Sequence, residues 1–350
     1  MTKRVLGTNQ NGETLEVSAI GLGCMGLNQG YPPFPPKEDG INFLQKAVEL
    51  GEDFFDTSEL YGFYKNEELV GEALQSVRNK VKIATKFGWN IKDGALLGLD
   101  SSPKAIKKAV EGSLKRLRTD HIDIYYQHRV DPNVPIEDVA LVMESLYKEG
   151  KILHWGLSEA GLKTLERANS AFKVTAVQYE YSLWCRELEK TLMPVLEKHK
   201  IGLAAFSPLG KGMLAGKFKK AESFSKDDYR STVPRMSNQE MMEHNLLIVD
   251  KLEAFAKERN CTVAQLSLAF ILQQKSYVVP IPGTTKINRL QENLKAMDLS
   301  LTESDWQEFN KLTSSMVVEG ERFGKEAEPW AGNEAVTRKS YPLNKVQGKS

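Results

Sequence analysis

Short apolar runs alternate with amphipathic stretches along most of the chain, and this rhythm constrains the fold more than any other feature. Strands separated by helices pair in parallel through right-handed crossovers. Eight such units over roughly 280 residues predict a closed (β/α)8 TIM barrel, with an open doubly wound sheet as the alternative. The eight runs are residues 20–25, 53–57, 81–86, 122–128, 152–158, 176–179, 202–208 and 278–283.

Several helix ends can be placed from local signals between these runs. Ser102 followed by Pro103 is typical of an N-cap and the first helical position. Asn66 is expected to cap another helix, and Gly150 to end a third. After the last predicted strand, a helix is expected to begin near Ile287.

Both ends of the chain depart from the strand–helix rhythm. Asn11-Gly12 lies between two short apolar segments and predicts an N-terminal β-hairpin, because both residues tolerate positive φ. We expect residues 1–312 to form the hairpin and the barrel, and residues 313–350 to form a C-terminal extension that is partly ordered or docked on the barrel. The polar segment 217–239 is long for a connection between a strand and its helix, and it is predicted to be a functional loop or lid.

Charge and composition exclude several classes of protein. The 350 residues include 47 Lys and Arg against 46 Asp and Glu, so the net charge of +1 gives no sustained positive field for a nucleic acid or a membrane. The N-terminus has no apolar signal region, and no uncharged apolar run is long enough to span a bilayer. The three cysteines have neither metal-ligand nor disulfide spacing, so no metal site is expected. These features predict a cytoplasmic protein and do not specify its oligomeric state.

A literal GxGxxG sequence occurs at residues 21–26, directly after the first predicted strand. In a Rossmann unit the last glycine opens a helix whose N-terminus holds the pyrophosphate. Here the following residues are NQGYPPFPPKEDG, and four prolines cannot begin that helix. We therefore interpret this segment as a barrel strand that ends in a loop.

Polar side chains lie at the ends of three consecutive predicted strands and in one of the following loops. Asp56 ends the second strand, and Tyr61 follows it by five residues. Lys86 and His128 end the third and fourth strands. Each residue alone has an ordinary structural explanation, as a cap, a partly solvated lysine or a satisfied core histidine. Because barrel enzymes build their sites at the carboxyl ends of the strands, the four together favour an active site.

These side chains suit the protonation of a carbonyl oxygen. Tyrosine has a reference pKa of about 10, and a neighbouring ammonium lowers it toward useful acid–base strength. Lys86 would have this effect on Tyr61, and Asp56 would hold the lysine in place. His128 would orient the substrate oxygen. No side chain supplies hydride, so the reaction requires a nicotinamide cofactor.

At these residues the sequence resembles the aldo-keto reductase family, from about residue 6 to about residue 312. The most specific stretch is GEDFFDTSELYGFYKNEELVGEAL at residues 51–74, and IATKFG and YYQH continue the pattern. The resemblance implies a (β/α)8 barrel that binds NADP(H) in extended form without a Rossmann domain. The roles it implies are general acid for Tyr61, pKa-lowering partner for Lys86, lysine anchor for Asp56 and carbonyl-orienting residue for His128.

The resemblance also implies a path for the cofactor along the later strand ends. Ser158 and Gln178 match positions that hold the nicotinamide carboxamide, and Phe206 matches the aromatic residue that stacks on the nicotinamide ring. The family often has asparagine where this chain has Glu159, which leaves that neighbouring contact open. The other implied cofactor contacts are Gly23, Met25 and Asp56 near the first strands, Ser207, Leu209 and Gly212 in a pyrophosphate-binding turn, and Gly283 in the last loop.

A basic segment after the last strand predicts the choice of cofactor. Thr284, Lys286 and Arg289 can converge on a phosphate at a helix N-terminus, where the helix dipole favours an anion. The resemblance makes this the 2′-phosphate site, with Glu292 and Asn293 at the positions that hold adenine. The cations favour NADP over NAD. The structural alternative is an ordinary capped helix with a solvated basic face.

The expected function is NADPH-dependent reduction of aldehydes or ketones to alcohols, with hydride from nicotinamide C4 and a proton from Tyr61. The partner is then a small-molecule carbonyl substrate, with no nucleic acid and no membrane. A nicotinamide-binding regulatory subunit that senses redox state and has weak reductase activity is the alternative. A metal-dependent hydrolase or lyase is disfavoured because no further ligand residue ends a strand. The identity of the substrate depends on the loops that follow the strands. Candidate aromatic residues of the substrate pocket are Tyr31, Trp89 and Trp184.

Overall fold

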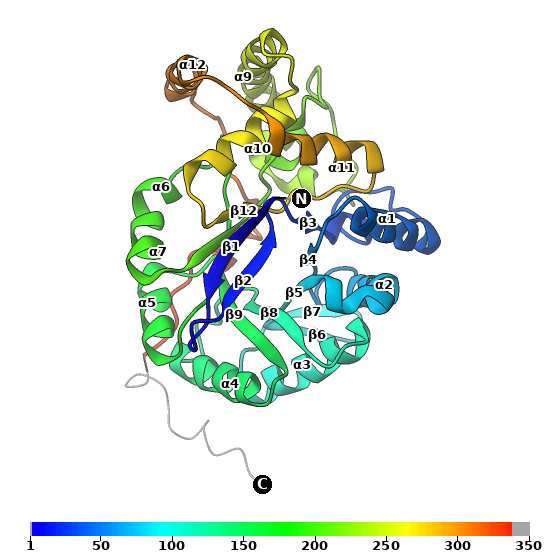
Figure 1. The fold of residues 1–350 in the computed structure, drawn as a ribbon, viewed down its shortest axis with the longest axis vertical. Coiled ribbons are helices and arrows are strands. Elements are labelled where there is room, and N and C mark those ends of the chain that lie inside the picture. Colours follow the sequence, from blue (N-terminus) through cyan, green and yellow to red (C-terminus); the bar gives the residue numbers. More distant parts are fainter. Residues whose placement is uncertain (1, 338–350) are drawn as a thin grey trace.

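Eight parallel strands curve around the centre of the computed structural model, which describes residues 2–337 (Figure 1). Neighbours in the sheet follow one another in chain order, and a parallel bridge between Gly23 and Gly283 joins the first strand to the end of the last. The N–H of Gly21 also donates to the Pro280 carbonyl at 2.9 Å. The (β/α)8 barrel is therefore confirmed, and the open doubly wound alternative is wrong. Its strands are β3 (Leu22–Gly23), β4 (Phe54–Asp56), β5 (Lys82–Phe87), β8 (Ile122–Gln127), β9 (Ile152–Ser158), β10 (Ala176–Glu180), β11 (Gly202–Phe206) and β12 (Val278–Pro280).

Helices surround the strands on the outside of the barrel (Figure 1). They are α1 (Lys37–Glu49), α2 (Lys65–Leu74), α3 (Pro103–Leu117), α4 (Ile136–Lys148), α5 (Leu162–Ala171), α6 (Leu188–Thr191), α7 (Met193–His199), α8 (Pro234–Ser237), α9 (Gln239–Glu258), α10 (Val263–Gln274), α11 (Ile287–Leu294) and α12 (Glu303–Ser314). The Ser102 hydroxyl caps α3 by accepting from the N–H of Ala105, and Gly150 follows α4 with a φ of +72°, as predicted. Within residues 2–337, no helix combines the length and the apolar character needed to cross a bilayer.

The prediction that Asn66 caps a helix is wrong. Tyr64 precedes α2 in a left-handed conformation, and Asn66 is a buried residue of the first turn. Its side-chain oxygen accepts from Thr57 at 2.5 Å, while its nitrogen donates to the Cys24 carbonyl at 2.9 Å and to Asn28 at 2.8 Å. Because these partners come from the ends of β3 and β4, Asn66 ties together two loops that carry predicted site residues.

The N-terminal hairpin of β1 (Lys3–Thr8) and β2 (Thr14–Ser18) lies across one end of the barrel (Figure 1). Leu6, Leu15 and Val17 are buried in one cluster with side chains from the barrel strands. A Cβ on Gly202, the first residue of β11, would lie 1.2 Å from the Leu6 carbonyl oxygen. The hairpin therefore closes the amino-terminal end of the barrel and leaves the carboxyl ends of the strands as the open face. Two further strands, β6 (Trp89–Lys92) and β7 (Ala95–Leu99), form a second hairpin after β5.

The chain beyond α12 returns to the barrel at the loop after β9. The N–H of Gly161 donates to the Asn333 carbonyl at 2.8 Å, and the Glu334 carboxylate accepts from the N–H of Thr164 at 2.7 Å. Arg167 donates to the carbonyls of Ala335 and Val336. The division of the chain at residue 312 stays a prediction, and the last part of the predicted extension, residues 338–350, lies outside the described residues.

Candidate active site

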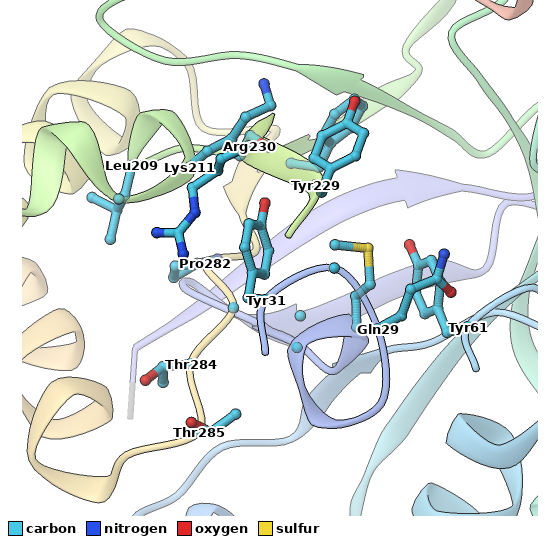
Figure 2. Close-up of a pocket in the computed structure, with 18 of the residues that line it drawn as sticks. Gln29, Tyr31, Tyr61, Leu209, Lys211, Tyr229, Arg230, Pro282, Thr284 and Thr285 are labelled. Carbon is cyan, nitrogen blue, oxygen red and sulfur yellow. The ribbon is translucent and has the colours of Figure 1, made fainter. Parts of the chain in front are cut away.

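A pocket of about 1140 Å³ opens at the carboxyl ends of the strands. Figure 2 shows Tyr61 and Thr284 at opposite sides of this pocket, with Tyr31 between them. The predicted site residues that line it are Gly23, Met25, Asp56, Tyr61, His128, Ser158, Gln178, Phe206, Ser207, Leu209, Gly212, Gly283, Thr284, Lys286, Arg289, Glu292 and Asn293. Lys86 does not line the pocket, because it is fully buried behind Tyr61. Within residues 2–337, no three His, Cys, Asp or Glu side chains gather in a way that could hold a metal ion.

Asp56 connects two of the other polar side chains, Lys86 and Gln178. Its Oδ1 accepts from Lys86 Nζ at 2.6 Å, and its Oδ2 accepts from Gln178 Nε2 at 2.7 Å. Lys86 Nζ also donates to the Thr57 carbonyl at 2.7 Å and to Tyr61 Oη at 3.2 Å. All three donors of the ammonium therefore have acceptors, and the lysine is held in a single position against the phenol.

Burial and neighbouring charges have opposite effects on the pKa values of Lys86 and Tyr61. Burial disfavours the Lys86 ammonium, but Asp56 and Tyr61 outweigh it and raise the pKa of Lys86. Burial raises the pKa of Tyr61, and the Lys86 charge lowers it. Lys86 thus acts in the expected direction, but burial is the larger effect and the net direction for Tyr61 is upward. The phenol is protonated at neutral pH and can serve as an acid.

His128 lies beside Tyr61, with its ring edge-on at a centroid distance of 5.8 Å. Its Nδ1 is 3.0 Å from Ser58 Oγ. Burial, together with the charges of Lys86 and Arg129, lowers the pKa of His128 well below its usual value, so the imidazole is neutral. A neutral ring that accepts from Ser58 at Nδ1 carries its proton on Nε2, where it can donate to a ligand. Sequence reasoning missed Ser58, which no motif distinguishes from an ordinary loop serine.

Two of the three residues expected near the nicotinamide have polar groups on the pocket wall. Asp56 occupies the amide nitrogen of Gln178, so the Gln178 oxygen remains as an acceptor. Ser158 Oγ accepts from Arg129 at 3.1 Å. The Glu159 carboxylate instead forms a two-point ion pair with Arg322 of the C-terminal segment, at 2.9 and 2.6 Å. Glu159 therefore anchors that segment, and whether it also contacts the cofactor stays open.

The predicted pyrophosphate turn contains several residues with positive φ. Ser207 has a φ of +49° and Gly212 a φ of +103°, the latter being a conformation that favours glycine. Gly23 and Gly283 have a packing reason to be glycine as well. A Cβ on Gly23 would lie 3.0 Å from the Ile281 carbonyl oxygen, and one on Gly283 would lie 3.2 Å from the Gly23 oxygen.

The 217–239 segment reaches across to the loop after β3. The N–H of Tyr229 donates to the Gly30 carbonyl at 2.8 Å. The Arg230 guanidinium lies 5.3 Å from the ring centroid of Tyr31, and Figure 2 shows these two residues on the same side of the pocket. The guanidinium is also 4.6 Å from the ring centroid of Phe224. Lys217, Tyr229 and Arg230 line the pocket, so the segment forms part of its wall. Its predicted action as a lid stays a prediction.

Aromatic side chains from distant parts of the chain complete the wall near His128. Trp89 packs edge-on against Trp330 at a centroid distance of 5.6 Å, and Phe323 also lines the pocket. Of the three aromatic residues predicted for the pocket, Tyr31 and Trp89 line it, whereas Trp184 is buried and does not. The sequence could not predict that Phe323 and Trp330 line the pocket, because no local pattern in a polar C-terminal segment specifies where it packs.

Comparison with known proteins places these observations in a family. Residues 19–314 match the Aldo/keto reductase family. A soybean (Glycine max) relative named probable aldo-keto reductase 1 is 41% identical over 309 residues, covering 88% of this chain and 89% of the relative.

Two solved structures show the same fold. The glycerol dehydrogenase from Gluconobacter oxydans is 28% identical, with a TM-score of 0.80 over 91% of this chain and 97% of that chain. An aldo/keto reductase from Klebsiella pneumoniae, solved with NADP and acetate, is 25% identical, with a TM-score of 0.68 over 92% and 99% of the two chains. The chain therefore belongs to the aldo/keto reductase family.

Proposed function

We propose that the protein reduces aldehydes or ketones to alcohols with NADPH. One observation carries the proposal: the Tyr61 hydroxyl stands on the pocket wall, 3.2 Å from a lysine that Asp56 holds at 2.6 Å. A phenol next to a fixed, buried ammonium is suited to proton transfer with a carbonyl oxygen. Membership of the aldo/keto reductase family and the NADP found in the Klebsiella relative support the same function.

The residues on the pocket wall fit a nicotinamide dinucleotide phosphate. Gln178, which is bonded to Asp56, offers an amide oxygen, and Phe206 offers an aromatic face on the wall of the same pocket, as the carboxamide and ring of nicotinamide require. Cations gather elsewhere on the wall and suit its phosphates: Lys217, Arg230, Lys286 and Arg289. When bound, NADPH supplies hydride to the carbonyl carbon.

The chain itself supplies the proton and orients the substrate. His128 Nε2 donates a hydrogen bond to the carbonyl oxygen and so directs it toward Tyr61. The Tyr61 hydroxyl gives its proton to that oxygen as hydride reaches the carbon, and Lys86 stabilises the phenolate that remains. Because Lys86 does not touch the substrate, it is a positioning residue that acts through Tyr61.

The replacement of Tyr61 by Phe tests the proposal. We expect Tyr61→Phe to bind NADPH normally, measured by quenching of protein fluorescence, and to lose at least about a hundredfold in kcat with 4-nitrobenzaldehyde. Tyr64→Phe is the matched control, because Tyr64 is three residues away and does not line the pocket. Normal turnover by Tyr61→Phe would refute the assignment. Negligible turnover by the wild type with tight NADPH binding would instead support a regulatory subunit.

A further inference from the structure

Arg129 is a pocket cation that takes no direct part in the proton transfer described above, although its charge acts to lower the pKa values of Tyr61 and His128. It follows His128 directly after β8 and lines the pocket. Its Nη1 donates to the His128 carbonyl at 2.7 Å and to Ser158 Oγ at 3.1 Å. Within residues 2–337, neither Nε nor Nη2 of Arg129 has a hydrogen-bond acceptor. Half of the guanidinium is therefore fixed by the protein, and the other half is unused.

Glu159, whose charge acts on Arg129, and Glu180, which lies beside Arg322, are already paired with other cations. Glu159 is held at two points by Arg322, and Glu180 accepts from Lys211 at 2.6 Å. Both glutamates are only 1% to 2% exposed, so solvent does little to screen them. Two carboxylates thus face three cations, and Arg129 forms no ion pair within residues 2–337.

An unpaired cation in such a place is unfavourable by itself. Burial lowers the pKa of Arg129, yet a guanidinium keeps its proton in proteins. The Glu159 charge offsets this in part and raises the pKa of Arg129, but no carboxylate within residues 2–337 forms an ion pair with Arg129. The protein therefore bears part of the cost of removing a positive charge from water. A ligand that brings an anion to Nε and Nη2 would remove this cost, and a carboxylate matches the fork of donors that Arg presents.

The neighbouring wall indicates what connects such an anion to the carbonyl group. The ring of Trp89 packs against two other rings: its centroid lies 6.0 Å from that of His128 and 5.6 Å from that of Trp330. Phe323 and Tyr229 line the same pocket. This wall suits a flat or short apolar spacer.

We propose that Arg129 is a specificity-determining residue that binds a carboxylate on the substrate. The favoured substrates are then aldehydes or ketones in which an aromatic ring or a short carbon chain separates the carbonyl group from a carboxylate. This inference rests on the proposed function, because it names the substrate class of the same pocket.

Matched pairs of charged and neutral aldehydes test this inference. The probes are 3- and 4-carboxybenzaldehyde and their methyl esters, which hold the carboxylate at two positions relative to the carbonyl. We expect kcat/KM of the wild type with NADPH to favour the acid in at least one pair by about tenfold. In Arg129→Met this preference should disappear through loss of the acid reaction, with the ester within about threefold of the wild type. Arg129→Lys should restore part of the preference for the acid. Arg118 is an exposed arginine outside the pocket, so Arg118→Met should leave the preference unchanged.

Binding of NADPH to each variant separates this role from cofactor binding. We expect fluorescence quenching to give the same NADPH affinity for Arg129→Met as for the wild type. Equal losses for acid and ester, or weakened NADPH binding, would show that Arg129 holds the cofactor or the site, and would overturn the inference. A wild type that reduces the esters as well as the acids would also overturn it while leaving the proposed function intact. Failure to reduce any of the four aldehydes, together with 4-nitrobenzaldehyde, would instead refute the proposed function.

Discussion

The ammonium of Lys86 lies 3.2 Å from the phenol oxygen of Tyr61, on the side of the tyrosine that faces away from the pocket. Lys86 is fully buried, and its other donors are used by Asp56 and by the Thr57 carbonyl. Lys86 therefore does not contact a bound substrate directly, and Tyr61 is a pocket side chain to which it donates a hydrogen bond. The relationship predicts that removing the lysine changes the acidity of the tyrosine more than it changes binding.

We expect Lys86→Met to reduce kcat by at least about tenfold while NADPH binding changes little. Without the ammonium, the pKa of Tyr61 rises further, since Lys86 has the largest effect among the charges that lower it. In the reverse direction, alcohol oxidation needs the phenolate, so the rising limb of its pH–rate profile should move to higher pH. Measurement of kcat for both directions across the pH range checks this. Lys86→Arg keeps a positive charge and should recover part of the wild-type pH–rate profile. If Lys86→Met lowers kcat but leaves the pH–rate profile unchanged, Lys86 has only a structural role.

Arg289 is predicted to distinguish NADPH from NADH. It lies in α11, on the pocket wall next to Thr284 and Lys286. If it binds the 2′-phosphate, Arg289→Ala should weaken NADPH binding by about tenfold or more and NADH binding much less. Fluorescence titration with both cofactors measures the difference, and Lys295→Ala, an exposed lysine outside the pocket, is the control. Equal weakening of both cofactors would contradict a 2′-phosphate role.

Glu52 should make the protein less stable as the pH rises. Burial raises the pKa of Glu52 to about 8, while the unfolded chain titrates near 4.5. Between these values the folded state binds more protons than the unfolded state, so Glu52 makes the free energy of unfolding fall with increasing pH by up to about 1.4 kcal/mol per unit. Glu52→Gln stays neutral and should flatten this slope in urea unfolding at pH 5 to 8.

The slope should not vanish in that variant, because burial also raises the pKa of Glu59 to about 8. Glu16→Gln, an exposed residue of β2, should leave the pH dependence as in the wild type. An unchanged slope in Glu52→Gln would mean that Glu52 titrates alike in the folded and unfolded states.

Gly202 allows the N-terminal hairpin to close the barrel. Because an added Cβ would lie 1.2 Å from the Leu6 oxygen, Gly202→Ala should displace the hairpin and cost about 3 kcal/mol or more in the free energy of unfolding. Gly12→Ala, in the hairpin turn with a φ of +85° and nothing within 4 Å of the new Cβ, should cost only about 1 kcal/mol. Urea unfolding of both variants gives the comparison, and similar costs would contradict a steric role for Gly202.

The alternation of apolar runs and helical stretches predicted the barrel correctly, because burial on both faces of a parallel strand leaves a continuous local signal in the sequence. The same signal located the strand ends, and residues at the carboxyl ends of parallel strands must meet on one face. Asp56, Tyr61 and His128 could therefore be placed together from the order of the residues alone, and all three line the pocket. Asn66 shows the limit of such reasoning, since its sequence suits a cap while its actual partners lie 38 to 42 residues away or in another loop.

The sequence by itself determined the order of the strands and the residues that their ends bring together, because both depend on short-range patterns. The tertiary structure alone decided how those residues behave. Burial outweighs Lys86 in setting the pKa of Tyr61, and the environment of a phenol depends on the whole fold. Likewise, Arg322 reaches Glu159 from 163 residues away and takes up both carboxylate oxygens, so that Glu159 forms no hydrogen bond with Arg129. Such long-range pairing depends on where a distant segment docks, which no local pattern in the sequence records.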